Sequence, residues 1–239
     1  DAYTMTEAVK DGITVNLVYD GRAAKVMLNQ DKVRQIEEYY AQCELEGANE
    51  HQVEESQKAV AKMEVIIGDP DRLRAVAEDF IKHYETRVAE GATVAGKAMF
   101  VCSNRNIAYD FYKIVKELRP EWTEKKICDD EVVLSEKDKK ELKPMEKIKL
   151  VMTRNKDDEK DLFDMLGTKE DRKEFDRQFK NPKSNFKIAI VVDMWLTGFD
   201  VPELDTIYID KPIQQHTLIQ TISRVNRVCE GKDKGLIVD

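Results

Sequence analysis

Hydrophobic residues along this chain are grouped in short continuous runs, and the segments between the runs carry apolar residues at helical spacing. Five continuous runs occupy residues 98–102, 149–153, 186–192, 206–209 and 235–238. Continuous apolar strands that alternate with helices are typical of a parallel sheet buried on both faces. This pattern predicts an α/β fold in which helices flank a parallel sheet.

Two helices are indicated clearly, and a third is expected near the C-terminal end. Apolar side chains recur at 3.6-residue spacing over residues 70–90 and 108–118. The first of these segments has Asp69 as a candidate cap and Pro70 at its first position, where a missing N–H costs nothing. A further helix is predicted over residues 217–228, before the last strand.

The first 96 residues show a weaker pattern. Residues 13–19 and 24–28 are interpreted as two short strands around Asp20 and Gly21, a pair of residue types suited to a hairpin turn. We interpret this hairpin as a connection rather than as the start of a core. The chain is divided into a connecting hairpin, a helical connector or insert, and a main α/β domain, over residues 1–30, 31–96 and 97–239.

The amino-acid composition and net charge exclude some classes of protein function. The 239 residues include 39 Lys and Arg against 47 Asp and Glu, a net charge of -8, which argues against an indiscriminate nucleic-acid coat but not against a local groove. No stretch approaches the ~18 apolar residues of a membrane span, and no signal segment is present. The four cysteines are scattered, as reduced intracellular thiols are. We therefore expect a cytoplasmic protein with no membrane contact and no metal site.

Two segments mimic catalytic motifs and are interpreted as structural. Residues 91–98 (GATVAGKA) match the skeleton of a phosphate-binding loop, but they leave a helix and enter a strand, and Ala98 has no hydroxyl for magnesium. Glu141 and Lys143, with an aspartate upstream, resemble the acidic set of metal-dependent nucleases. They lie in a highly charged block beside Pro144, which weakens any strand that would present them.

Three other segments carry candidate chemistry in a suggestive order. Ser103, Asn104 and Arg105 directly follow the first apolar run, at the strand end where parallel sheets meet their ligands. The sequence IVVDMWLTGFDVP then places Thr197, Gly198 and Asp200 after the third run, where glycine allows close approach of backbone to a ligand and Asp200 could accept from a ribose hydroxyl.

The third segment is the helix QTISRVNR. It places Gln220, Arg224 and Arg227 at positions i, i+4 and i+7, on one face of the predicted helix. Arginines presented together suit bidentate capture of phosphate. Taken alone, the segment fits a solvated basic stripe equally well.

The three segments together resemble motifs four, five and six in the second RecA-like domain of superfamily two helicases and translocases. The T-G-F-D-x-P loop and the Q-T-I-S-R-V-N-R helix are most similar to the motor (R) subunit of type I restriction enzymes. Ser223 replaces the glycine of the general helicase pattern, which favours the restriction-enzyme branch. The resemblance covers residues 98–239 and implies that residues 1–30 connect to a first motor domain.

The resemblance implies roles for these residues. Arg224 and Arg227 match arginine-finger positions, and Gln220 would sense the γ-phosphate. Gly198 and Asp200 match the loop that couples nucleotide to nucleic acid. The DNA-backbone contacts implied by the match are Thr197, Ser103, Asn104 and Arg105.

The resemblance also implies cofactors and partners. ATP and Mg2+ would be bound mainly by a first RecA-like domain, and we expect this chain to be a fragment that is inactive alone. Expected partners are double-stranded DNA, the first RecA-like domain, and the methyltransferase and specificity subunits, for an ATP-dependent type I site-specific deoxyribonuclease. Two alternatives stay open: the same domain of another superfamily two DNA motor, and a non-catalytic nucleic-acid-binding module.

Overall fold

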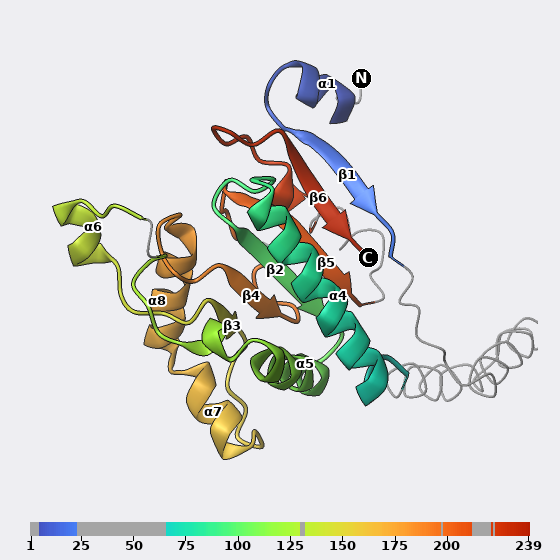
Figure 1. Cartoon of the computed structure of the whole chain (residues 1–239), viewed down its shortest axis with the longest axis vertical. Coiled ribbons are helices and arrows are strands. Elements are labelled where there is room, and N and C mark those ends of the chain that lie inside the picture. The colour runs from blue at the N-terminus through green and yellow to red at the C-terminus, as the bar shows by residue number, and fades with distance from the viewer. Residues whose placement is uncertain (1–4, 23–65, 130–131, 197, 212–220, 222) are drawn as a thin grey trace, which may run out of the picture.

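The computed structural model describes residues 5–22, 66–129, 132–196, 198–211, 221 and 223–239. Within these ranges, strands lie side by side in one parallel sheet in the order β1-β6-β5-β2-β4-β3 (Figure 1). Their bounds are β1 (Asn16–Asp20), β2 (Lys97–Cys102), β3 (Ile148–Leu150), β4 (Ile188–Val191), β5 (Leu204–Asp210) and β6 (Lys234–Val238). The parallel sheet predicted from the five apolar runs is confirmed, and β1 adds a sixth strand at its edge.

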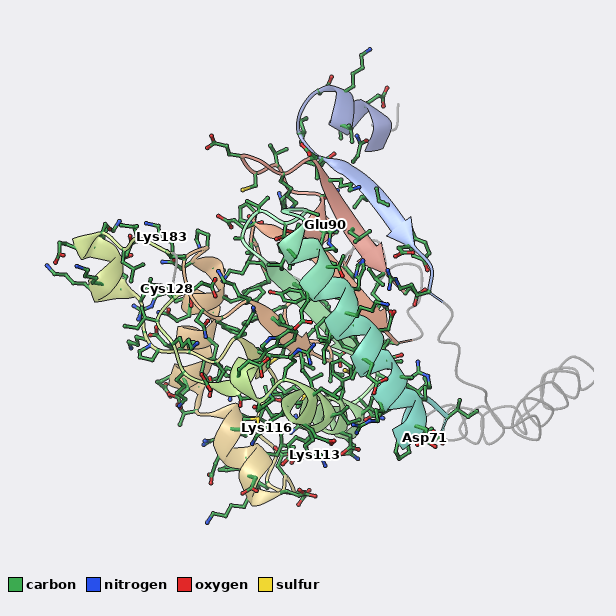
Figure 2. All side chains as sticks on the ribbon, viewed as in Figure 1. Asp71, Glu90, Lys113, Lys116, Cys128 and Lys183 are labelled. Carbon is green, nitrogen blue, oxygen red and sulfur yellow. The ribbon has the colours of Figure 1, made fainter. Side chains whose placement is uncertain are left out.

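Helices cover this sheet, and α4 begins where the sequence predicts a cap. The helices are α1 (Met5–Lys10), α4 (Pro70–Ala89), α5 (Arg105–Leu118), α6 (Glu136–Glu141), α7 (Lys160–Leu166) and α8 (Lys169–Lys180), with a 3-10 turn η1 (Pro120–Thr123). The Asp69 carboxylate accepts hydrogen bonds from the backbone N–H groups of Asp71 and Arg72. These groups have no partner inside the helix, so the cap supplies one. Figure 2 shows Asp71 and Glu90 at opposite ends of α4.

No helix in the described ranges combines the length and the apolar composition that crossing a bilayer would require.

The sheet is buried on both faces, which explains why its strands are continuously apolar. In β2, Phe100 belongs to a core formed with α4 and α5, whereas Met99 and Val101 belong to a second core formed with α8. All three side chains are at most 2% exposed. Successive side chains of a strand point to opposite faces, so a strand between two cores needs apolar residues at every position.

Aromatic side chains join α4 and α5 to the first of these cores. The ring of Phe80 on α4 meets Phe100 and Tyr208 edge to face, at centroid distances of 5.1 and 4.8 Å. Phe111 of α5 stacks on Phe100 at 3.9 Å. Burial of one such ring contributes about 1.5–3 kcal/mol. Helix α4, which lies in the segment interpreted as a connector over residues 31–96, is therefore part of the packed core.

The N-terminal hairpin stays a prediction, because its second strand lies outside the described residues, whereas its first strand joins the main sheet. Strand β1 pairs in parallel with β6, from Asn16 beside Lys234 to Asp20 beside Val238. Its Leu17 packs against the second core. The predicted strand at 24–28 and the helices expected over residues 31–63 lie outside the described residues.

The last predicted helix ends earlier than its pattern indicates. Residues 223–225 are helical, and Asn226 is not. The backbone of Arg227 instead forms an isolated antiparallel bridge with Thr14. The helix face predicted for Arg224 and Arg227 together is therefore wrong for Arg227, because pairing with the N-terminal segment replaces the last helical turn.

Candidate functional site

Arg224 joins the end of the last helix to the loop between β4 and β5. Its Nη1 donates a hydrogen bond to the backbone carbonyl oxygen of Phe199 at 3.0 Å, and its Nε donates to that of Leu196 at 3.3 Å. Each of these two carbonyl groups belongs to a residue that is at most 5% exposed. Arg224 therefore holds the loop in place through its backbone.

Arg227 meets the same loop through a charged pair. Its Nε lies 3.5 Å from Oδ1 of Asp200, and the two side chains are 50% and 60% exposed. Gly198 lies in this loop between Leu196, which Arg224 contacts, and Asp200, which Arg227 contacts. It has a φ of +68° and open space where a Cβ would stand. The structure thus brings the second and third predicted segments together, although Gln220 and Thr197 lie outside the described residues.

An aromatic layer beneath the loop fixes its shape. The ring of Phe199 stacks on Trp195 with centroids 4.1 Å apart and planes within 2°. Phe179 of α8 packs against Trp195 at 5.2 Å. Trp195 has a φ of 67°, a left-handed conformation that is rare outside glycine and is held here by its neighbours. Sequence reasoning missed Trp195, although the aromatic residues on either side of Leu196, Thr197 and Gly198 were visible in the printed sequence.

The first predicted segment lies at the carboxyl ends of the strands and has structural partners of its own. Ser103 donates from its hydroxyl to the backbone carbonyl oxygen of Asp210 at 2.9 Å. The Asn104 side chain caps α5 by accepting from the N–H of Ile107.

Arg105 follows directly and reaches the loop after β3. It donates to the carbonyl oxygen of Thr153 at 2.6 Å and to both carboxylate oxygens of Asp158. The Arg105 side chain is 30% exposed, whereas that of Asp158 is 6% exposed. Part of the guanidinium group therefore faces solvent at the edge of the sheet.

Two ion pairs beside this segment were not found from the sequence. Arg72 of α4 binds the carboxylate of Asp210 in a bidentate manner, and the two side chains are 17% and 9% exposed. Lys211 donates to Asp193 at 2.6 Å, across the ends of β4 and β5. Only the fold shows these pairs, because their members lie far apart in the chain.

The two motif-like segments make structural contacts. Lys97 belongs to the segment 91–98 that resembles a phosphate-binding loop. It is fully buried, and its Nζ donates to the carbonyl oxygen of Phe186 at 2.5 Å. Burial lowers the pKa of this amine well below its usual value. Lys143 pairs with Glu174 at 3.0 Å. In the part of the chain that the structure describes, no three His, Cys, Asp or Glu side chains form a group that could hold a metal ion.

The parallel sheet with helices packed on both faces is a RecA-like α/β domain. A family model for domain 3 of the type I restriction enzyme subunit R matches residues 94–239. The chain therefore belongs to the type I restriction enzyme subunit R family.

Relatives with known names agree with this assignment. The HindI endonuclease subunit of Haemophilus influenzae is 35% identical over 240 residues, which cover 99% of this chain and 20% of that protein. A protein of Methanocaldococcus jannaschii assigned as the MjaIXP endonuclease subunit is 35% identical, over 100% of this chain and 20% of its own length. The chain thus spans about a fifth of these relatives.

A solved structure has the same fold. A fragment assigned to the HsdR subunit of a type I restriction enzyme from Vibrio vulnificus superposes with a TM-score of 0.53 and 12% identity. The match covers 98% of this chain and 33% of that one. At this identity the likeness concerns the fold alone.

Proposed function

We propose that this chain is the second RecA-like motor domain of a type I restriction enzyme R subunit. In this role it contributes an arginine finger and DNA-backbone contacts to ATP-dependent translocation of double-stranded DNA, which precedes cleavage. One observation carries the proposal: the half-exposed Arg227 lies beside Asp200 in the loop that also carries Gly198. An arginine at the surface, next to backbone that a ligand can approach, is suited to a phosphate group on another domain.

The two arginines have different parts in this proposal. The 3.5 Å separation of Arg227 Nε and Asp200 Oδ1 exceeds the 2.7–2.9 Å usual for a charge-assisted hydrogen bond, and both groups are open to solvent. Such a pair contributes about 0–1 kcal/mol, so a phosphate can replace the carboxylate at little cost. Arg224 is engaged by two backbone carbonyl groups and instead holds the loop. Gln220 keeps its proposed role near the γ-phosphate.

This chain would complete an ATP site rather than hold one alone. Gly198 and Asp200 suit contact with the nucleotide from across a domain interface, since Gly198 leaves room for an approaching group. A first RecA-like domain would bind ATP and Mg2+, and ATP hydrolysis would supply the free energy for movement. Arg227 would offset the negative charge that develops during phosphoryl transfer, an effect of about 10³-fold or more in rate.

The DNA contacts are assigned to the carboxyl edge and the loop. Arg105 has a partly exposed guanidinium there, and Ser103 and Asn104 fix the turn that presents it. Thr197 completes the proposed set. Contacts of this type to phosphates carry no sequence information, which suits a translocase whose target site is chosen by a separate specificity subunit. The methyltransferase subunit and the first motor domain are the other proposed partners.

The test is Arg227→Ala in an R subunit that carries this domain. We expect the variant to bind duplex DNA normally and to lose about 10³-fold in DNA-dependent ATPase rate. Arg177→Ala, which removes an exposed arginine of α8, is the matched control and should keep full activity. An unchanged ATPase rate in the Arg227 variant would contradict the finger role.

A further inference from the structure

The N-terminal segment contacts the chain directly at the proposed arginine finger. The backbone N–H of Val15 donates to the carbonyl oxygen of Asn226 at 2.8 Å. The preceding residue, Thr14, forms the antiparallel bridge with Arg227. These contacts join residues more than 200 positions apart in sequence, and they fall immediately before β1.

The last strand also approaches this segment closely. At Gly235 of β6, a Cβ atom would stand 2.4 Å from the carbonyl oxygen of Val225. Only glycine permits this approach of the two backbones, because a Cβ atom essentially never comes within 3.0 Å of a heavy atom from another part of the chain. Val225 is itself fully buried in the second core. The backbone just before Arg227 is therefore fixed by β6 and by the core.

After Val225, the position of the backbone is fixed by contacts with the N-terminal segment. Asn226 has left the helix, and Arg227 is exposed, so the contacts of Thr14 and Val15 take over where helix and core end. That segment is itself anchored, since the N–H groups of Ile13 and Thr14 both donate to the carbonyl oxygen of Ala8. Ala8, on α1, is buried.

We propose that the backbone of Thr14 and Val15 positions Arg227 for its role at the nucleotide, an inference that rests on the proposed finger function. Thr14 and Val15 touch no reacting group and act through Arg227. The position of Arg227 therefore depends on the segment that directly precedes β1. A shift of that segment relative to β6 would move Arg227 away from Asp200 and change the ATPase rate without touching the nucleotide.

The side chain of Thr14 provides an internal control. Its Oγ1 is one of three buried polar side-chain atoms in the described part of the chain that have no hydrogen-bond partner. Replacement of this hydroxyl by a methyl group therefore removes no bond. Thr14→Val should keep the bridge to Arg227, because the bridge is made by the backbone.

The experiment is a double-mutant cycle in an R subunit that carries this domain. Val15→Pro removes the N–H that bonds to Asn226, and Val15→Ala keeps it. We expect Val15→Pro to lower the kcat of the DNA-dependent ATPase about 10- to 100-fold, as misplacement of a catalytic group by ~1 Å does, with little change in KM for ATP. Val15→Ala and Thr14→Val should stay within about twofold of wild type.

The positioning role is tested by comparing the effect of Val15→Pro in wild type with its effect in Arg227→Ala. Val15→Pro should add no further loss of kcat in the Arg227→Ala background, since its target is already absent. An equal fold loss in both backgrounds would overturn the positioning role and leave the finger intact. An unchanged kcat in Arg227→Ala alone would overturn the finger and the positioning together.

A second variant covers the case in which Val15→Pro fails to fold. Ile13→Pro removes the N–H that Ile13 donates to Ala8 and leaves the bond from Val15 to Asn226. It should loosen the segment and lower kcat less, again with no additional loss in Arg227→Ala. A folded Ile13→Pro variant with wild-type kcat would count against the proposal.

Discussion

Arg224 donates from Nη1 to the carbonyl oxygen of Phe199 at 3.0 Å, so the last helix and the loop before β5 are held together by a side chain on one part and the backbone of the other. Replacement of Arg224 by alanine leaves the carbonyl groups of Leu196 and Phe199 without this partner. We expect the free energy of unfolding to fall by about 1.5–3 kcal/mol, as for hydrogen bonds from a charged donor. Urea denaturation of the two proteins measures the difference.

The stability of Arg227→Ala should be measured in the same way and compared with that of Arg224→Ala. Its exposed pair with Asp200 should contribute at most about 1 kcal/mol. The two variants thus separate stability from the proposed chemistry: Arg224→Ala should lose more stability, and Arg227→Ala should lose ATPase activity in a protein of nearly normal stability. Equal losses of stability would mean that the two arginines hold the loop alike.

Gly235→Ala tests the close approach of β6 to the end of the last helix. The added methyl group would meet the carbonyl oxygen of Val225 at 2.4 Å, so either β6 or the buried end of the last helix must shift. We expect a loss of about 1–3 kcal/mol in stability. At Gly21 an added methyl meets a ring carbon of Tyr19 at an ordinary 3.5 Å, so Gly21→Ala should have little effect. Thermal unfolding compares the two variants.

Lys232 should make a contribution to the stability of the domain that rises with pH in the alkaline range. Burial lowers the pKa of this amine from 10.5 to about 8, while its Nζ donates to the carbonyl oxygens of Pro202 and Leu204. Between pH 8 and 10.5 the folded state binds fewer protons than the unfolded state. The contribution of Lys232 to the free energy of unfolding therefore increases with pH across this window, by on the order of 2 kcal/mol.

The measurement is urea denaturation at several pH values from 7.5 to 9.5. The slope of stability against pH should be smaller in Lys232→Met than in wild type, because the depressed amine is gone. Burial also lowers the pKa of Lys97 and Lys187 and raises that of the Cys102 thiol, which acts in the opposite sense, so the test is the difference in slope between the two proteins. Lys116→Met, which removes an exposed lysine of α5 (Figure 2), controls for the lost charge. Identical slopes in wild type and Lys232→Met would contradict the assignment.

The ion pair between Arg72 and Asp210 should tie α4 to the carboxyl end of β5. Both side chains are largely buried, so Asp210→Asn leaves a charge without its partner and should cost about 3 kcal/mol. A double-mutant cycle with Arg72→Met should show strong coupling. Arg74→Met, two residues further along α4 in an exposed pair with Glu117, should change stability by less than about 1 kcal/mol.

The sequence predicted those parts of the fold that depend on local pattern. The five apolar runs correspond to β2 through β6, because a strand buried on both faces shows its burial at every position. The start of α4 followed from Asp69 and Pro70, whose effects act within one turn. The motif order singled out the loop at Asp200 and the segment of Arg227 as candidate sites, and the structure shows that these two residues lie together.

What the sequence could not predict depends on contacts between distant segments. Residues 16–20 have a strand pattern, but only the fold shows that they pair with β6 at the far end of the chain. Apolar spacing continues past Val225 in the last helix, yet pairing with Thr14 removes Arg227 from it. The engagement of Arg105 by Asp158 likewise depends on the loop after β3. In each case tertiary contacts outweigh local preference.

The pairing of β1 with β6 has a consequence for how the domain is made. Tyr19 and Asp239, which share a hydrogen bond beside these strands, are 220 residues apart. Ribosomes add about 5–20 residues per second, so β1 leaves the ribosome about 10 to 45 s before its partner is complete. During that interval the backbone of β1 lacks its hydrogen-bonding partner β6. The strands β2, β4 and β5 can already pair with one another. The backbone contacts around Arg227 therefore require closure of a loop of more than 200 residues, an entropic cost that local contacts do not carry.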